Sequence, residues 1–209
     1  MSNNFFFRTL STLILAPLII YSVIAGGWFF ILFLLIIFLL GIYEIIKIKN
    51  LIIKFIIFSL LVIFLFVLFQ ISILQNGRLY LVLILLITWL SDIGGYIFGK
   101  LFRGPNIKVI SPNKTYSGFL GSILFTQLLL FFFERFNLNL HFDYPKSSLF
   151  LFFCSLIVIS GDLLFSYFKR VSMIKDFSNF IPGHGGIFDR IDGLILLAIF
   201  FYFYLKVII

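Results

Sequence analysis

Long apolar stretches recur along the whole chain, and short polar segments separate them. The stretches cover roughly residues 9–25, 27–46, 51–74, 79–98, 118–133, 148–166 and 191–208. A predominantly apolar run of about 17–25 residues has the length of a helix that crosses a bilayer. A transmembrane barrel would show shorter alternating segments with turns about every ten residues, and the sequence lacks that alternation. The pattern therefore predicts an all-α, polytopic integral membrane protein with about seven transmembrane helices.

The composition agrees with this class. Of the 209 residues, 62% are hydrophobic and only 11% are charged. A soluble domain of this size needs more polar residues to cover its surface. No linker or low-complexity tract divides the chain, so we predict one domain spanning 1–209. The single cysteine, Cys154, lies in an apolar stretch and excludes an intramolecular disulfide.

The basic residues gather on one side of the predicted helices. With the N-terminus inside, twelve of the sixteen Lys and Arg residues fall on the cytoplasmic side. The opposite side keeps only Arg78, Arg135, Lys146 and Lys206. Because Lys and Arg in short loops favour the cytoplasm, this bias predicts an N-in/C-out orientation. Topology thus explains the formal net charge of +8, and no nucleic acid is expected as a partner.

Most of the acidic residues fall at the cytoplasmic ends of the later helices. Asp92 and Asp162 lie on apolar stretches, and Asp189 and Asp192 stand at the start of the last one. A carboxylate within the bilayer costs at least about 2.5–3.5 kcal/mol, so these aspartates should face a shared polar cavity open to the cytoplasm. The alternative is pairing with basic residues at the headgroup level. For Asp176, which follows a lysine, both interpretations stay open.

The segment PGHGGIFDRID gathers polar groups directly before the last apolar stretch. Gly185 and Gly186 have no side chains that would keep a ligand from their backbone N–H groups. Asp189 and Asp192 are three residues apart and share one face of the predicted helix. The positive end of that helix dipole favours their ionised forms. Two ionised carboxylates beside exposed backbone N–H groups suit a hard cation such as Mg²⁺ and the phosphates that it carries.

Asp162, at the cytoplasmic end of the preceding stretch, is the candidate metal ligand from the opposite side of the cavity. The alternative is that the two later aspartates only cap the last helix. That alternative does not account for His184, the paired glycines, or Lys169 and Arg170, which stand in the same predicted loop, about residues 167–190. One histidine in the loop and no cysteine cluster argue against zinc.

A second basic loop, about residues 99–117, contains SPNKTYSG at the start of the next helix. Lys114 and Thr115 could offer an ammonium and a hydroxyl group to an anionic ligand at that helix N-terminus. The glycine spacing of a P-loop is missing, and the positive-inside pattern alone would also explain the basic residues. Gly95 and Gly99 form a small-xxx-small pair, which is typical of close helix packing.

The stretch from Ser166 to Asp192, SYFKRVSMIKDFSNFIPGHGGIFDRID, resembles the signature of the phosphatidate cytidylyltransferase (CDP-diacylglycerol synthase) family. The ordered elements S-x-x-K-R, K-D, P-G-H-G-G and D-R-x-D are all present. Two upstream blocks, SDIGGYIFGKLF and SPNKTYSGFLG, also resemble that family, so the similarity covers about residues 89–193. The chain departs from the family in its short N-terminal half and in Gly193, where a serine is expected.

The resemblance implies transfer of the cytidylyl group of CTP to phosphatidic acid, which yields CDP-diacylglycerol and pyrophosphate in phospholipid biosynthesis. It implies Mg²⁺ as cofactor, held by Asp162 and Asp189, and is compatible with a second, monovalent cation such as K⁺. Together with the residues above, the catalytic candidates are Asp162, Asp189, Lys169, Arg170, His184, Arg190 and Asp192. The substrate-binding candidates are Asp92, Lys114, Thr115, Ser166, Lys175, Asp176, Gly185 and Gly186.

The resemblance also implies a homodimer in the bacterial inner membrane, in contact with membrane lipids and with its active site facing the cytoplasm. Residues 1–78 would then be scaffold helices, and residues 79–209 would supply the catalytic helices and loops.

Two other functions stay open. A CTP-dependent polyprenol or dolichol kinase shares the nucleotide and part of the motif, but the full P-G-H-G-G-x-x-D-R-x-D run favours the cytidylyltransferase. A cation or proton transporter would also use intramembrane carboxylates. It predicts acidic residues near the bilayer midplane and on both sides, whereas nearly all of them fall at the cytoplasmic ends here.

Overall fold

The computed structural model of the chain describes residues 2–105, 114–131, 144–178 and 185–208. Its helices are α1 (Ser2–Ala25), α2 (Gly27–Lys47), α3 (Leu51–Ile73), α4 (Gly77–Phe102), α5 (Tyr116–Gln127), α7 (Tyr144–Val171) and α8 (Phe188–Ile208). Each predicted apolar stretch overlaps one of them, and no extended strand occurs in these ranges, which confirms the all-α prediction. Among the described residues, α2, α3, α4 and α7 are long and apolar enough to cross a membrane.

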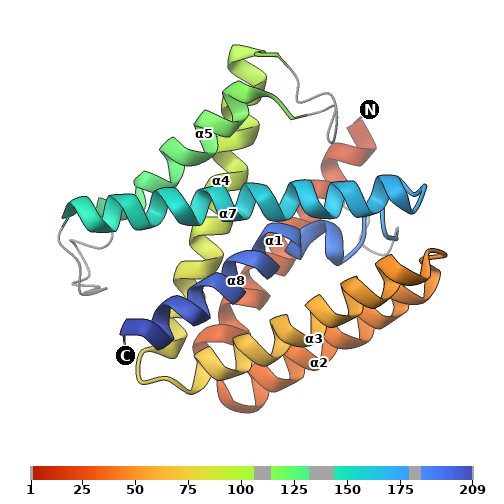
Figure 1. Ribbon diagram of the computed structural model, residues 1–209, viewed down its shortest axis with the longest axis horizontal. Helices are drawn as coiled ribbons and strands as arrows, with labels where there is room; N and C mark the ends of the chain where they lie inside the picture. The colour runs from red at the N-terminus through yellow and green to blue at the C-terminus, as the bar shows by residue number, and fades with distance from the viewer. Residues whose placement is uncertain (1, 106–113, 132–143, 179–184, 209) are drawn as a thin grey trace.

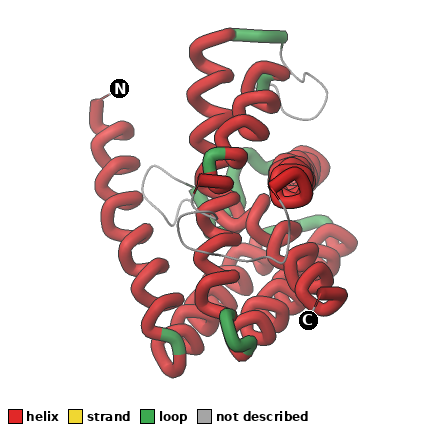
Figure 2. Tube along the Cα trace, turned by 90° about the vertical axis from the view of Figure 1, so that its left-hand side faces the viewer, coloured by secondary structure: helices red, strands yellow, loops and turns green. Residues whose placement is uncertain are grey.

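The helix ends alternate between two sides of the molecule (Figure 1). The end of α2 and the start of α3 lie on the right, as does the end of α7, whereas the turns from α1 to α2 and from α3 to α4 lie at the lower left. Helix α8 packs against both α7 and α3. Helix α1 runs along the outer edge of the bundle (Figure 2) and contacts α2 and α4.

Small residues bring α4 and α5 close together. A Cβ atom on Gly95 would lie 2.7 Å from the hydroxyl oxygen of Ser122, and one on Gly99 would lie 3.1 Å from Oγ1 of Thr115. The Ser122 hydroxyl donates to the carbonyl of Ser91 at 2.8 Å. The packing role predicted for Gly95 and Gly99 is therefore confirmed. The crossing places the start of α5 beside the last turns of α4.

A second close crossing joins α7 to α8. A Cβ atom on Gly161 would lie 2.7 Å from the carbonyl oxygen of Asp192, and one on Gly193 would lie 2.8 Å from Oδ1 of Asp162. A serine at position 193 would therefore collide with these neighbours on this backbone. The crossing lets the two helices approach closely at the level of two candidate aspartates.

Aromatic side chains also hold α7 and α8 together, about one helical turn away from this crossing. Phe165 on α7 stacks against Phe188 on α8, with ring centroids 5.9 Å apart and an interplanar angle of 20°. Phe177 packs against both rings, and all three side chains are buried. These three rings form an apolar cluster next to the polar groups at the start of α8.

The two polar loops are shorter than the sequence predicts, because α4 and α7 each continue beyond the predicted apolar stretch. Helix α4 extends to Phe102 and α7 to Val171. In α7 the extension is stabilised by Phe168, which is buried and packs edge-on against Phe165. The prediction that Lys169 and Arg170 stand in a loop is therefore wrong, since both occupy the last turn of α7.

We expect Gly193→Ala to destabilise the protein. Glycine to alanine normally stabilises a helix by about 0.5–1 kcal/mol. Here the added Cβ would lie 2.8 Å from both Oδ1 of Asp162 and Cγ1 of Val158, and overpacking of this kind costs about 1–3 kcal/mol. A lower melting temperature in detergent is the expected result. A higher one would show that the crossing is looser than the structure indicates.

Candidate active site

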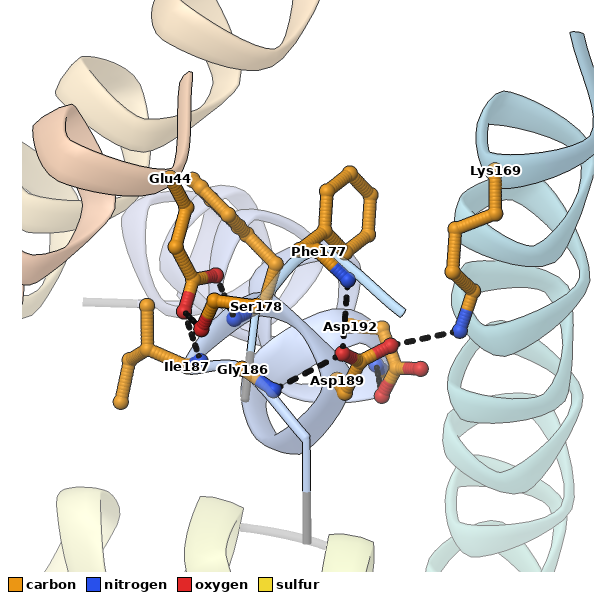
Figure 3. A network of polar contacts seen from close by, with 10 residues as sticks. Glu44, Lys169, Phe177, Ser178, Gly186, Ile187, Asp189 and Asp192 are labelled. Carbon is orange, nitrogen blue, oxygen red and sulfur yellow. Dashed lines mark hydrogen bonds and ion pairs between the residues drawn. The ribbon is translucent and has the colours of Figure 1, made fainter. Parts of the chain in front are cut away.

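The first turn of α8 carries Asp189, and three donors surround its carboxylate (Figure 3). The Lys169 ammonium donates to Oδ1 at 2.6 Å, and the backbone N–H groups of Phe177 and Gly186 donate to Oδ2 at 3.1 and 2.9 Å. The side chains of Lys169 and Asp189 are only 16% and 7% exposed. Charge-assisted hydrogen bonds shielded from water are stronger than neutral ones. These three hydrogen bonds hold the carboxylate in one position. The predicted place of Asp189, in the first turn of the last helix, is confirmed.

Glu44 reaches the same place from α2. Its side chain is buried, with the residue only 1% exposed. Oε1 accepts from the Ser178 hydroxyl at 2.6 Å and from the N–H of Ile187 at 2.7 Å, and Oε2 accepts from the N–H of Phe188 at 3.1 Å. We call Glu44, Asp189 and Lys169, together with the residues at 177–178 and 186–188 that donate to the two carboxylates, the α8 corner (Figure 3).

The paired glycines make room for these two carboxylates. Gly185 has a φ of 79°, in the left-handed region that glycine tolerates, and a Cβ there would lie 2.9 Å from Oδ2 of Asp189. A Cβ on Gly186 would lie 2.5 Å from Oε1 of Glu44. In this structure the Gly186 N–H donates to Asp189. Its contact with a substrate phosphate stays a prediction.

A second charged group lies beside the crossing of α7 and α8. The Lys114 ammonium contacts Oδ2 of Asp162 at 2.7 Å, with side chains 33% and 20% exposed. Asp162 and Asp192 are electrostatic neighbours of each other and of Asp92, and Arg190 is a further charged neighbour of Asp92. We call Asp92, Asp162, Asp192 and Lys114 the aspartate cluster. It unites α4, α7, α8 and the segment before α5.

The remaining predicted residues are not part of these two groups. Thr115 caps α5, because its Oγ1 accepts from the N–H of Gly118 at 3.1 Å. Ser166 is half-buried on α7. Three further residues are exposed, and no described hydrogen bond joins them to the α8 corner: Arg170, Lys175 and Asp176. His184 lies outside the described residues.

Glu44 is the site residue that sequence reasoning missed. It stands near the end of an apolar stretch, between Tyr43 and Ile45, with lysines following closely. A carboxylate in that place is readily interpreted as a headgroup-level ion pair. Its hydrogen-bond partner Ile187 is 143 residues away in the chain, and no local pattern connects the two.

The fold and these charged groups define a helical membrane protein with ion-paired carboxylates gathered at one end of α7 and α8. The family model described as the cytidylyltransferase family matches residues 48–208, and the chain belongs to that family. A phosphatidate cytidylyltransferase from Rickettsia felis is 33% identical over 207 residues, which cover 94% of this chain and 90% of that relative.

Staphylococcal relatives match the chain over a shorter range. Proteins named phosphatidate cytidylyltransferase from Staphylococcus haemolyticus and Staphylococcus epidermidis are 39% and 40% identical over 127 and 124 residues. These matches cover 59% of this chain and 47% of each relative, so the chain matches about half the length of the staphylococcal proteins.

Proposed function

We propose that this protein transfers the cytidylyl group of CTP to phosphatidic acid and releases pyrophosphate, which makes CDP-diacylglycerol for phospholipid synthesis. A phosphate oxygen of the lipid attacks the α-phosphorus of CTP, and the bond from that phosphorus to the β-phosphate oxygen breaks. Family membership supports the cytidylyl transfer, and the name of the Rickettsia relative supports the lipid acceptor. The observation that carries the proposal is the buried Asp189–Lys169 pair at the start of α8.

The chain's own charges suit such a reaction. The ammonium groups of Lys169 and Lys114 lie at the α8 corner and the aspartate cluster, where they can bind phosphate oxygens and stabilise the charge that develops during transfer. Lys169 is largely shielded from water, so its charge acts in a medium of low dielectric constant. Binding of the substrate phosphates would exchange the contacts of these lysines from carboxylates to phosphates.

We propose Asp162 and Asp189 as the ligands of Mg²⁺. Among the described residues, no group of three or more His, Cys, Asp or Glu side chains, the aspartate cluster included, is arranged so that it could hold a metal ion by itself. Mg²⁺ does not need one, since it commonly takes one or two carboxylates together with phosphates and water. Each of the two carboxylates already faces a cation, a lysine ammonium at 2.7 Å or 2.6 Å. When bound, Mg²⁺ neutralises charge on the transferring group and on pyrophosphate.

Removal of Mg²⁺ is expected to stop the reaction. Loss of the metal's charge stabilisation costs several kcal/mol, so chelation should lower the rate by about 100-fold or more. Lipid labelling in the presence of EDTA measures the loss, and added Mg²⁺ should restore the rate. A full rate in EDTA would contradict the metal proposal, and varying K⁺ at constant ionic strength would test the second cation.

We further propose that α1, α5 and α8 cross the membrane together with α2, α3, α4 and α7, in the N-in/C-out orientation in the bacterial inner membrane. The alternation of helix ends in Figure 1 supports this arrangement. Apolar side chains on the outside of the bundle, such as Trp28 and Phe55, are 84% and 71% exposed and suit contact with lipid. The α8 corner and the aspartate cluster would then face the cytoplasm, which supplies CTP. We also propose a homodimer.

The proposed activity is tested by incubating the purified protein with CTP labelled in the cytidine, Mg²⁺ and phosphatidic acid. The cytidylyltransferase moves the label into a lipid. A CTP-dependent lipid kinase would leave the label in water-soluble CDP. Label that stays entirely in the aqueous phase would overturn the proposal.

A further inference from the structure

Glu44 and Asp189 accept hydrogen bonds from the same two segments of the chain. Asp189 accepts from the N–H of Phe177, and Glu44 accepts from the hydroxyl of the next residue, Ser178. Asp189 also accepts from the N–H of Gly186, and Glu44 accepts from the N–H groups of the two residues that follow it. The two carboxylates therefore clamp segments 177–178 and 186–188 from opposite sides (Figure 3).

The burial of Glu44 requires all of its donors. A buried carboxylate is costly unless it is hydrogen-bonded, and this one receives three hydrogen bonds while only 1% exposed. Two of the donors, the N–H groups of Ile187 and Phe188, belong to the start of α8, where backbone N–H groups have no partner within the helix. The positive end of the helix dipole adds to the attraction. Glu44 thus caps α8 from a different helix.

We propose that Glu44 is a positioning residue for cytidylyl transfer, which fixes the first turn of α8 and so holds the Asp189 carboxylate against Lys169. The inference rests on the proposed function. Glu44 lies before the matched family region, residues 48–208. Helix α2 is therefore part of the support of the site as well as of the scaffold predicted for residues 1–78.

Glu44→Gln is the most specific test of this role, because it keeps the size of the side chain and replaces one acceptor oxygen by a donor. The two oxygens of Glu44 accept from both Ile187 and Phe188, so the new amide group must oppose at least one backbone N–H group. We expect kcat to fall by about 10–100-fold through misplacement of Asp189. The KM for CTP should change by less than about threefold, since both oxygens of Glu44 already accept hydrogen bonds from the protein itself.

Two further variants distinguish a loss of activity caused by a misplaced Asp189 from one caused by lower stability of the whole protein. Glu44→Asp keeps the charge on a side chain one methylene shorter, and we expect an intermediate kcat. Leu34→Ala removes a buried side chain from the same helix, ten residues or about 15 Å away. It should lower the melting temperature while the kcat of the folded protein stays within about twofold of wild type.

Hydrogen–deuterium exchange reports the clamp without reference to activity. Glu44→Gln should raise amide exchange in the peptide that contains Ile187 and Phe188, and Leu34→Ala should leave that peptide protected. Unchanged exchange, or unchanged kcat in Glu44→Gln, would overturn the inference. If the wild type does not label the lipid at all, the proposed function fails, and the exchange at these two amides still decides whether Glu44 holds the start of α8.

Discussion

Asp189→Asn is expected to reduce CDP-diacylglycerol formation by about 1,000-fold or more, while the protein still inserts into the membrane. Asparagine keeps the shape of the side chain but loses its charge. Its NH₂ group must point either at the Lys169 ammonium or at the N–H groups of Phe177 and Gly186, all of which are donors. Lys169 is only 16% exposed and would lose its counter-charge. Such a loss is severe, because a buried charge without a partner is costly.

The Asp189 prediction is measured on purified protein, with lipid labelling per folded molecule. Lys206→Gln serves as the control, since it removes a charge from the other end of the same helix, about 25 Å away. The control should keep the wild-type rate and the same yield in the membrane. A near-normal rate in Asp189→Asn would count heavily against a role for this carboxylate in the chemistry.

Asp162→Asn is expected to lower the rate by about 100-fold or more, as the loss of a metal-binding carboxylate would. Lys114 contacts Asp162 at 2.7 Å, so the two residues should act as a unit. Lys114→Gln alone should also lower the rate. The double variant should lose much less than the product of the two single losses, because residues that act together are not additive.

This double-mutant cycle has a matched control on the same helix. Ser160 is exposed two residues before Asp162, and its hydroxyl donates only to its own helix, at the carbonyl of Leu156. Ser160→Ala should leave the rate unchanged. If the effects of Asp162→Asn and Lys114→Gln multiply fully, the contact between the two side chains has no part in catalysis.

Local patterns in the sequence predict much of this fold. Apolar stretches of membrane-spanning length fall on the helices, and the small-residue pair Gly95 and Gly99 predicts a close helix contact that the structure confirms at Ser122 and Thr115. The position of Asp189 in the first turn of α8 also follows from the turn residues before it. These features depend on residues a few positions apart, where periodicity and turn chemistry act.

The partners of the site residues depend on long-range packing, and the sequence does not show them. The Glu44 carboxylate lies beside Ile187 because α3 packs against both α2 and α8 and so brings their ends together. Lys169 meets Asp189 because α7 continues one turn past its apolar stretch. From the sequence, we expect Gly185 and Gly186 to leave their backbone N–H groups open to a ligand. The structure shows that the two glycines also make room for two protein carboxylates. An acidic residue in an apolar stretch, such as Glu44, is the signal to follow in a similar sequence.

The most direct test of the proposed chemistry compares CTP labelled at the α-phosphate with CTP labelled at the γ-phosphate, each incubated with the purified protein, Mg²⁺ and phosphatidic acid. Attack at the α-phosphorus predicts that the α-label enters the lipid and that the γ-label is released as pyrophosphate. A lipid that carries the γ-label, or no labelled lipid from either nucleotide, would contradict cytidylyl transfer by this protein.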